Sequence, residues 1–142
     1  MGADDVINYK QYDVAEKVMA LTDEAGCDVV FDCVGGESFK TCLDCVGPFG
    51  RLVTILPPPD DASIGKLFMK NASVHQEFMG ARSMFGWRPE HQGQTLATIA
   101  ELVDAGKLKP HVSHEFELDD LAKAHQQQET NHTVGKIVVK VK

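Results

Sequence analysis

The chain has 142 residues, of which 43% are hydrophobic, and it carries a formal net charge of −7. That length suits one domain with a buried core, and an acidic chain without a Lys/Arg stripe is a poor candidate for nucleic-acid binding. No apolar run approaches the roughly 20 residues that span a bilayer, and the N-terminus does not have the pattern of a signal peptide. Because the four cysteines also lack the spacing of a disulfide framework, we expect a cytoplasmic protein that contacts no membrane.

The N-terminal segment predicts a short strand at Asp5–Asn8 followed by a helix. Asp13 is placed to cap that helix, and Glu16 three residues later completes a capping-box pattern. Apolar residues recur at helical spacing between positions 14 and 25, and Gly26 is the predicted stop.

The next stretch predicts a strand, a glycine turn and a helix. The apolar run at 28–34 suits a strand that is buried on both faces, with Asp32 as its one interior charge. Such a carboxylate is more simply explained by backbone N–H groups at a helix start than by acid–base catalysis. Gly35 and Gly36 then lead into a predicted helix at 37–46. A second buried strand is predicted at 51–56, where three prolines follow and end it.

The second half continues the alternation of helix and strand. Its predicted elements are a short helix at 64–70, an edge strand at 73–79, a loop at 80–93, a helix through 96–106, a helical face at 118–125 that packs His125 into the core, and a final strand at 136–141. Strands that alternate with helices predict an α/β fold whose sheet is parallel and doubly wound. Ligands of such sheets bind beyond the carboxyl ends of the strands, and no glycine-rich phosphate loop precedes residue 28.

Five segments resemble the medium-chain dehydrogenase/reductase superfamily, in order and at the family's spacing. They are MGADDVINY (1–9), DVVFDCVGG (28–36), GRLVTILPP (50–58), LVDAGKLKP (102–110) and HTVGKIVVKV (132–141). The nearest branch is the zinc-independent NAD(P)H quinone oxidoreductases. The resemblance implies that residues 1–142 are the C-terminal portion of an NAD(P)-binding domain, a partial Rossmann-like sheet that lacks its first two strands. Residues 111–142 would then return toward an absent catalytic domain.

The resemblance implies the cofactor half of an NAD(P)H-dependent oxidoreductase that reduces quinones, enones or other carbonyl compounds by hydride transfer. NADP and NAD both remain open, with NADP favoured, and no catalytic residue or zinc ligand is expected in this chain. It also implies a homodimer that pairs through the strand at 73–79. The alternative is a truncated, non-catalytic chain that folds and self-associates without binding dinucleotide tightly.

The resemblance also assigns cofactor contacts, which involve mainly the backbone. They are Tyr9 near the adenosine phosphate; Cys33, Val34 and Gly35 at the nicotinamide ribose; Thr54, Ile55 and Leu56 at the carboxamide; Phe78, Met79 and Gly80 along the ring; and Asn131 where some relatives place an arginine for the 2′-phosphate. For Tyr9, a half-exposed aromatic that closes a strand is an equally good reading. The turn at 33–35 could be an ordinary strand-to-helix connection, and Asn131 cannot supply the arginine's charge.

Cys42 and Cys45 form a C-x-x-C pattern inside a predicted helix. A zinc site needs about four converging ligands, and the other two cysteines flank a strand instead. We therefore predict small buried thiols here. The six histidines show no metal-binding pattern either.

Overall fold

The structure is a computed structural model that describes residues 2–130 and 132–141. The chain divides into two compact units, Met1–Phe85 and Gly86–Lys142. Among the described residues, no helix is both long and apolar enough to cross a membrane.

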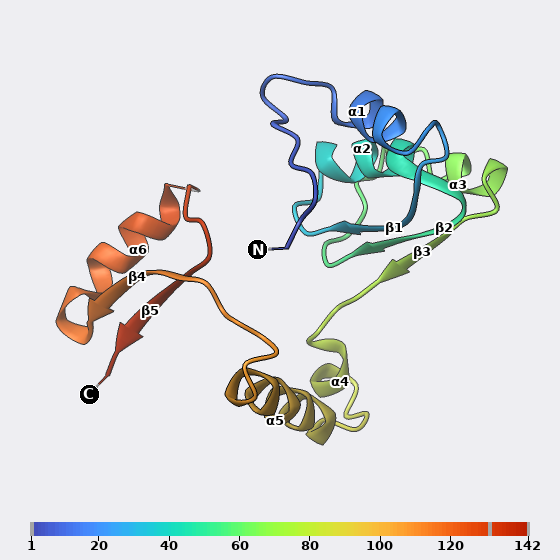
Figure 1. Ribbon diagram of the computed structural model, residues 1–142. Helices are drawn as coiled ribbons and strands as arrows, with labels where there is room; N and C mark the ends of the chain where they lie inside the picture. Colours follow the sequence, from blue (N-terminus) through green and yellow to red (C-terminus); the bar gives the residue numbers. More distant parts are fainter. Residues whose placement is uncertain (1, 131, 142) are drawn as a thin grey trace. The chain divides into compact units, whose positions relative to one another are not determined.

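The first unit is a parallel three-stranded sheet with helices on one face (Figure 1). Its elements are α1 (Val14–Leu21), β1 (Cys27–Asp32), α2 (Glu37–Cys45), β2 (Val46–Thr54), α3 (Gly65–Met69), β3 (Ser73–Gln76) and α4 (Ala81–Met84). The strand order is β1-β2-β3, and Val30, Leu52 and Val74 lie level across it. The predicted α/β fold with a parallel sheet is confirmed.

The core of this unit forms between α2 and the sheet. Its buried side chains are Phe39 and Leu43 of α2, Val46 and Leu52 of β2, and Leu67 of α3. Each large apolar side chain buried in this way contributes about 1.5–3 kcal/mol. The helix predicted at 37–46 therefore exists because its apolar face covers the sheet.

The prediction that the strand at 28–34 is buried on both faces is wrong. Side chains alternate along a strand, so Val30 and Asp32 face the α2 side while Val29 and Phe31 point away from it. Phe31 is 69% exposed, because no helix within residues 2–85 covers that face. β2 alternates in the same way, since Leu52 is buried and Arg51 is exposed.

Helix α1 begins as predicted and ends early. The Glu16 N–H donates to the Asp13 carboxylate at 2.9 Å, which confirms Asp13 as the N-cap. The helix ends at Leu21, however, and not at Gly26. The Thr22 hydroxyl donates to the Val18 carbonyl in the last turn and accepts the Gly26 N–H at 3.0 Å. This side chain thus satisfies a carbonyl and an N–H group that would otherwise bond within a further helical turn.

The strand predicted at Asp5–Asn8 does not form, because this segment has no neighbouring strand to pair with. The Asn8 carbonyl accepts N–H groups from Gln11 and Tyr12 and closes a turn instead.

Two glycines, Gly26 and Gly47, allow the backbone before β1 to pack against the backbone at the start of β2. A Cβ on Gly47 would lie 2.4 Å from the Ala25 carbonyl oxygen, and a Cβ on Gly26 would lie 2.8 Å from the Gly47 Cα. Gly26 also has a φ of +73°, which side chains disfavour. The entries of β1 and β2 are therefore in direct backbone contact.

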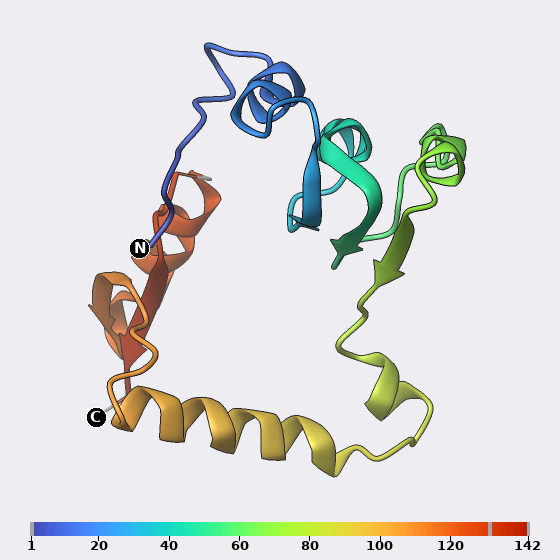
Figure 2. The ribbon, with the colours of Figure 1, turned by 45° about the vertical axis from the view of Figure 1, so that its right-hand side comes forward.

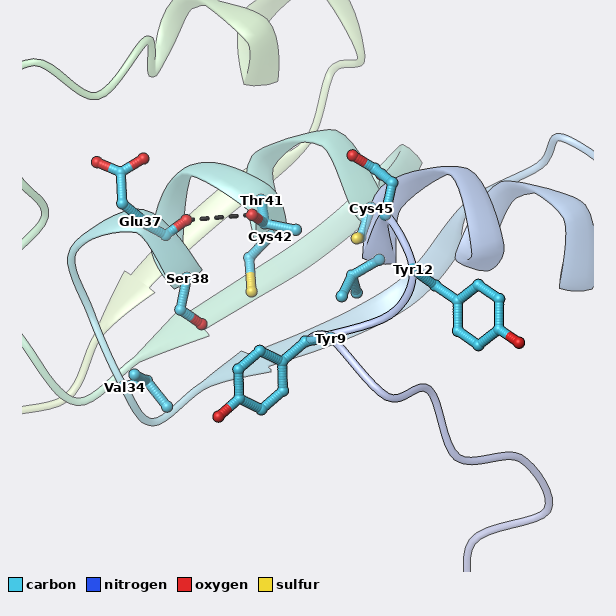
Figure 3. A pocket seen from close by; sticks show the side chains of 10 residues that line it. Tyr9, Tyr12, Val34, Glu37, Ser38, Thr41, Cys42 and Cys45 are labelled. Carbon is cyan, nitrogen blue, oxygen red and sulfur yellow. Dashed lines mark hydrogen bonds between the residues drawn. The ribbon is translucent and has the colours of Figure 1, made fainter. Parts of the chain in front are cut away.

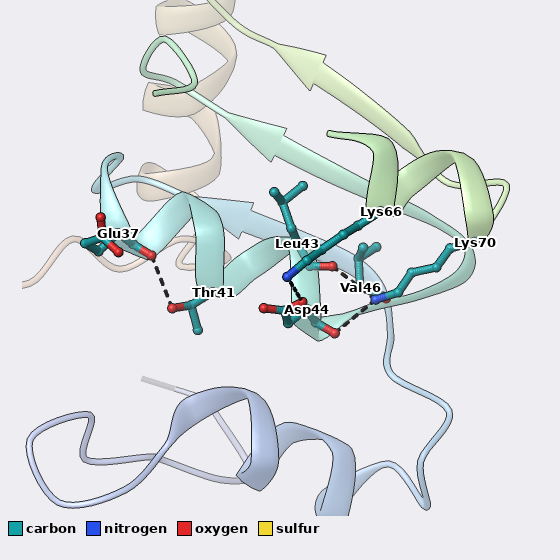
Figure 4. Close-up of polar contacts among 7 residues, drawn as sticks. All are labelled: Glu37, Thr41, Leu43, Asp44, Val46, Lys66 and Lys70. Carbon is teal, nitrogen blue, oxygen red and sulfur yellow. Dashed lines mark hydrogen bonds and ion pairs between the residues drawn. The ribbon is translucent and has the colours of Figure 1, made fainter. Parts of the chain in front are cut away.

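The end of α2 is held by a lysine that follows α3 (Figure 4). The Lys70 Nζ donates to three carbonyl oxygens, those of Leu43 and Asp44 at 3.0 Å and of Val46 at 2.6 Å. Lys66, one turn earlier, forms an ion pair with the Asp44 carboxylate. A cation at a helix C-terminus satisfies carbonyls that have no partner within the helix.

The second unit contains α5 (Glu90–Asp104), β4 (Val112–Glu117), α6 (Leu121–Glu129) and β5 (Lys136–Lys140). β4 and β5 pair in parallel through the α6 crossover, which lies beside both strands (Figure 2). The final strand is confirmed, while β4 was not predicted. α4 and the start of α5 lie in the segment 80–93 that was predicted as a loop. His125 is exposed and not packed in a core, because α6 turns Ala124 inward instead.

Candidate functional site

The candidate site is the edge of the sheet where the three parallel strands of the first unit end. Asp32, Thr54 and Gln76 lie level at the carboxyl ends of β1, β2 and β3. The predicted contact residues at 33–35, 54–56 and 78–80 occur at or just after these ends. The parallel topology thus brings three of the predicted groups to one edge, as such sheets do for ligands.

Asp32 organises the turn that follows β1. It is 1% exposed, and its carboxylate accepts hydrogen bonds from four donors. The donors are the N–H groups of Val34 at 3.2 Å and Gly35 at 3.1 Å, and the hydroxyls of Ser38 at 2.9 Å and Thr54 at 3.3 Å. The prediction that backbone N–H groups hold this carboxylate is confirmed. The two hydroxyl donors were not foreseen.

These contacts decide the charge of Asp32. Burial, the largest single influence, raises its pKa because it disfavours the charged form. The hydrogen bonds from Gly35, Ser38, Val34 and Thr54 together outweigh burial and lower the pKa below its ordinary value of 3.8. Asp32 is therefore ionised at neutral pH, with both oxygens engaged. It is suited to holding the turn and unsuited to donating a proton.

The turn after β1 packs directly on the segment after β2. Gly35 has a φ of +76°, and a Cβ there would lie 2.9 Å from the Leu56 Cδ1. Glycine is favoured here by the positive φ, which strains other residues, and a side chain would also require Leu56 to move aside. A Cβ on the neighbouring Gly36 would meet no atom within 4 Å, so the backbone at Gly36 is open to an approaching group.

Thr54 is placed differently from its two neighbours. Its side chain is 1% exposed, and its carbonyl accepts the Glu77 N–H at 2.9 Å, while Ile55 and Leu56 are exposed. The Thr54 hydroxyl accepts the Leu56 N–H at 3.2 Å and lies 2.9 Å from the Leu56 carbonyl oxygen. Ile55 and Leu56 thus remain accessible at this edge, whereas Thr54 lies beneath them.

Two predicted residues, Tyr9 and Val34, line one pocket of about 620 Å³ between the segment before α1 and helix α2 (Figure 3). Each of these two side chains is 74% exposed. Ser38, Thr41 and Cys42 contribute the α2 wall. The pocket therefore connects the candidate edge with the helix that follows the glycine turn.

The remaining predicted residues are less closely connected to this site. Phe78 and Met79 are exposed, and Phe78 packs on Gly80. Their link to the other strand ends is the hydrogen bond from the Glu77 N–H to Thr54. Asn131 lies outside the described residues.

Of the two cysteines of α2, Cys45 is a buried thiol as predicted, whereas Cys42 is half-buried. Burial raises the pKa of Cys45 to about 11 and also raises that of Cys42. Within residues 2–130 and 132–141, no three His, Cys, Asp or Glu side chains are grouped to hold a metal ion.

Comparison with known proteins gives a consistent set of relatives. Residues 1–139 match the family described as zinc-binding dehydrogenase. The chain is 32% identical to a quinone oxidoreductase-like protein 2 homolog from Nematostella vectensis over 100% of its own length and 40% of that protein. It is 30% identical to a quinone oxidoreductase from Pseudomonas aeruginosa over 97% of the chain and 43% of that protein.

Solved structures show the same similarity. A quinone oxidoreductase from Pseudomonas syringae superposes with a TM-score of 0.78 and 29% identity, over 97% of this chain and 43% of that one. An NAD-dependent alcohol dehydrogenase superposes with a TM-score of 0.80 and 26% identity, over 99% of this chain and 39% of that one. The chain thus spans about two fifths of the length of its relatives.

Proposed function

Because the chain belongs to the zinc-binding dehydrogenase family, within the medium-chain dehydrogenase/reductase superfamily, and matches the C-terminal part of its relatives, we propose that it forms the nicotinamide side of an NAD(P)-binding domain in an oxidoreductase. The observation that carries this proposal is the shared edge of the sheet. There Gly35 is buried against Leu56, while Val34, Gly36, Ile55 and Leu56 around that contact are exposed.

The residues at this edge fit a flat ring with an amide substituent. The backbone at Gly36 is open, so a flat ring can approach the main chain there. The N–H groups of Val34, Gly35, Ile55 and Leu56 bond within the chain and hold the two loops in place beside it. When bound, a nicotinamide dinucleotide supplies a hydride. This chain's residues would hold and orient the cofactor, which is the protein's usual share of such chemistry. Asp32 is ionised and fully engaged, so we assign it no proton transfer.

A quinone, enone or other carbonyl compound is the substrate class that we propose for the whole protein. It accepts a hydride, and two relatives are named quinone oxidoreductases. We also propose that residues 111–142 lead back toward a catalytic domain. The choice between NAD and NADP and the cytoplasmic location stay predictions.

Ligand fragments test the proposal on the chain itself. With ¹⁵N-labelled protein, reduced nicotinamide mononucleotide should shift the amide resonances of Val34, Gly35, Ile55 and Leu56. NADH and NADPH should do the same with dissociation constants above 1 mM (roughly −4 kcal/mol or weaker), since no glycine-rich phosphate loop precedes the turn.

Adenosine monophosphate is the matched control, because it carries the other half of the dinucleotide. It should leave residues 33–35 and 54–56 unshifted. Shifts there with adenosine monophosphate alone would contradict the assignment of the nicotinamide end. Micromolar binding of NADPH would show that the chain carries a more complete site than we propose.

Self-association is a second candidate function, and the exposed edge of β3 favours it. β3 is the last strand of the three-stranded sheet, with Ser73, His75 and Gln76 exposed. An edge strand offers unpaired backbone groups to another chain. A homodimer through residues 73–79 is compatible with a cofactor-binding role.

A further inference from the structure

Asp32 and Thr54 each hold one of the two loops that form the candidate edge. The Asp32 carboxylate accepts the N–H groups of Val34 and Gly35 in the turn after β1. The Thr54 hydroxyl contacts both the N–H and the carbonyl oxygen of Leu56 in the segment after β2. Each side chain thus acts on the loop of its own strand.

The same two side chains also contact each other. The Thr54 Oγ1 lies 3.3 Å from the Asp32 Oδ2, and both residues are 1% exposed. One backbone bond runs alongside, from the Ile55 N–H to the Asp32 carbonyl at 3.3 Å. A buried hydrogen bond to a charged group is stronger than one in water, so this contact can transmit a displacement between the loops.

We propose that Asp32 and Thr54 form a positioning pair that fixes the turn Val34–Gly35 relative to the segment Ile55–Leu56. The inference rests on the proposed function, because these are the two backbone surfaces assigned to the nicotinamide end. A ligand that touches both loops then meets one preformed surface, and binding it costs less conformational entropy.

The Thr54 hydroxyl divides one proton between the Leu56 carbonyl oxygen at 2.9 Å and the Asp32 carboxylate at 3.3 Å, so it links the two loops. A hydroxyl has one proton to donate, and here two acceptors are within reach, the Asp32 carboxylate and the Leu56 carbonyl. The other groups that face Asp32 are the Ser38 hydroxyl, two peptide N–H groups and the Cys42 thiol, whose pKa Asp32 helps to raise. Thr54 is therefore the side chain through which this carboxylate reaches β2.

A double-mutant cycle on amide resonances tests the pair without ligand. Thr54→Val removes the hydroxyl at nearly constant shape, Thr54→Ser restores it, and Ser38→Ala removes an Asp32 donor that does not reach β2. In ¹⁵N-labelled chain, Asp32→Asn should shift the amide of Leu56, which does not itself contact Asp32. That shift should persist with Thr54→Ser and disappear with Thr54→Val. An equal Leu56 shift with Thr54→Val overturns the proposal.

A titration with NADH connects the pair to the cofactor. Thr54→Val should weaken NADH binding about 2- to 10-fold, the effect of one lost hydrogen bond. Thr54→Ser should bind NADH nearly as tightly as wild type. In Ser38→Ala, NADH should still shift the amide resonance of Leu56. Unchanged affinity in Thr54→Val overturns the positioning role. If NADH shifts the amide resonances of neither loop in the wild type, the proposed function fails. The double-mutant cycle without ligand still tests the coupling between Asp32 and Thr54 in that case.

If Asp32→Asn does not fold, hydrogen exchange in the single Thr54 variants decides the proposal. The Gly35 amide should exchange several-fold faster in Thr54→Val than in wild type, and at the wild-type rate in Thr54→Ser. Equal Gly35 rates in all three proteins overturn the proposal.

Discussion

Asp32 makes the stability of the folded chain depend on pH. Its pKa is lower in the folded state than the ordinary 3.8 that it takes when unfolded, so the folded state binds the proton less readily. The carboxylate's stabilising contribution is therefore complete above the unfolded-state pKa. It is lost as the pH falls through the lower folded-state pKa.

Urea unfolding between pH 7 and pH 3 measures this dependence. The wild-type free energy of unfolding should decrease below about pH 4, and Asp32→Asn should lower it at pH 7 by about 2 kcal/mol while flattening its decrease in acid. Asp61→Asn is the control, because Asp61 pairs with Lys40 on the surface. A stability of Asp32→Asn equal to wild type at pH 7 would show that the buried network contributes nothing.

The sequence identifies Asp32 but not its partners across the sheet. A single charge in an apolar run is visible in the sequence, and backbone donors at a helix start are a general expectation. Thr54 is different, because it lies 22 residues away and meets Asp32 only once the register of β1 against β2 is fixed, while Ser38 meets it through the turn that leads into α2. No local pattern specifies that register.

At the level of elements, the C-terminus of α2 depends on Lys70. Lys70→Met keeps the aliphatic stem and removes three charge-assisted hydrogen bonds, so we expect a loss of about 1–2 kcal/mol in the free energy of unfolding. Lys66→Met is the matched control from the same helix region. Its ion pair with Asp44 is about half exposed and should contribute less than about 1 kcal/mol. Chemical denaturation compares the two variants, and equal losses would contradict a capping role for Lys70.

The helices and strands show what periodicity alone can determine. α2 was predictable because its apolar spacing matches the face that it buries, with Phe39 and Leu43 inward. The end of α1 was not, because the Thr22 side chain terminates the helix before Gly26. The segment at Asp5–Asn8 has the composition of a strand, but a strand also needs a partner.

For the whole molecule, we expect a homodimer that forms through β3. Sedimentation velocity across a concentration series should show a monomer–dimer equilibrium. His75→Lys places a lysine cation on each side of a two-fold interface and should weaken the dimer by tenfold or more, about 1.4 kcal/mol. His75 is exposed, so folding should be unaffected. Gln11→Lys adds the same charge away from β3 and should not alter assembly. A chain that stays monomeric at every concentration contradicts the edge pairing.

The fold class was predictable because alternating strands and helices admit few topologies. The exposure of Phe31 was not, since an apolar run does not reveal whether one face or two will be covered. The same holds for the candidate edge. The strand ends were predictable, while the burial of Thr54 beneath Ile55 and Leu56 follows from three-dimensional packing.

The contact between Gly26 and Gly47 has a consequence for how this sequence can change over time. Any side chain at Gly47 would overlap the Ala25 backbone, and any side chain at Gly26 would overlap Gly47 itself. Main-chain atoms cannot shorten or rotate aside as a neighbouring side chain could. A substitution at either position therefore requires the main chain itself to shift, and a second substitution in a nearby side chain cannot relieve the overlap. We expect both positions to stay glycine while the exposed positions around them vary.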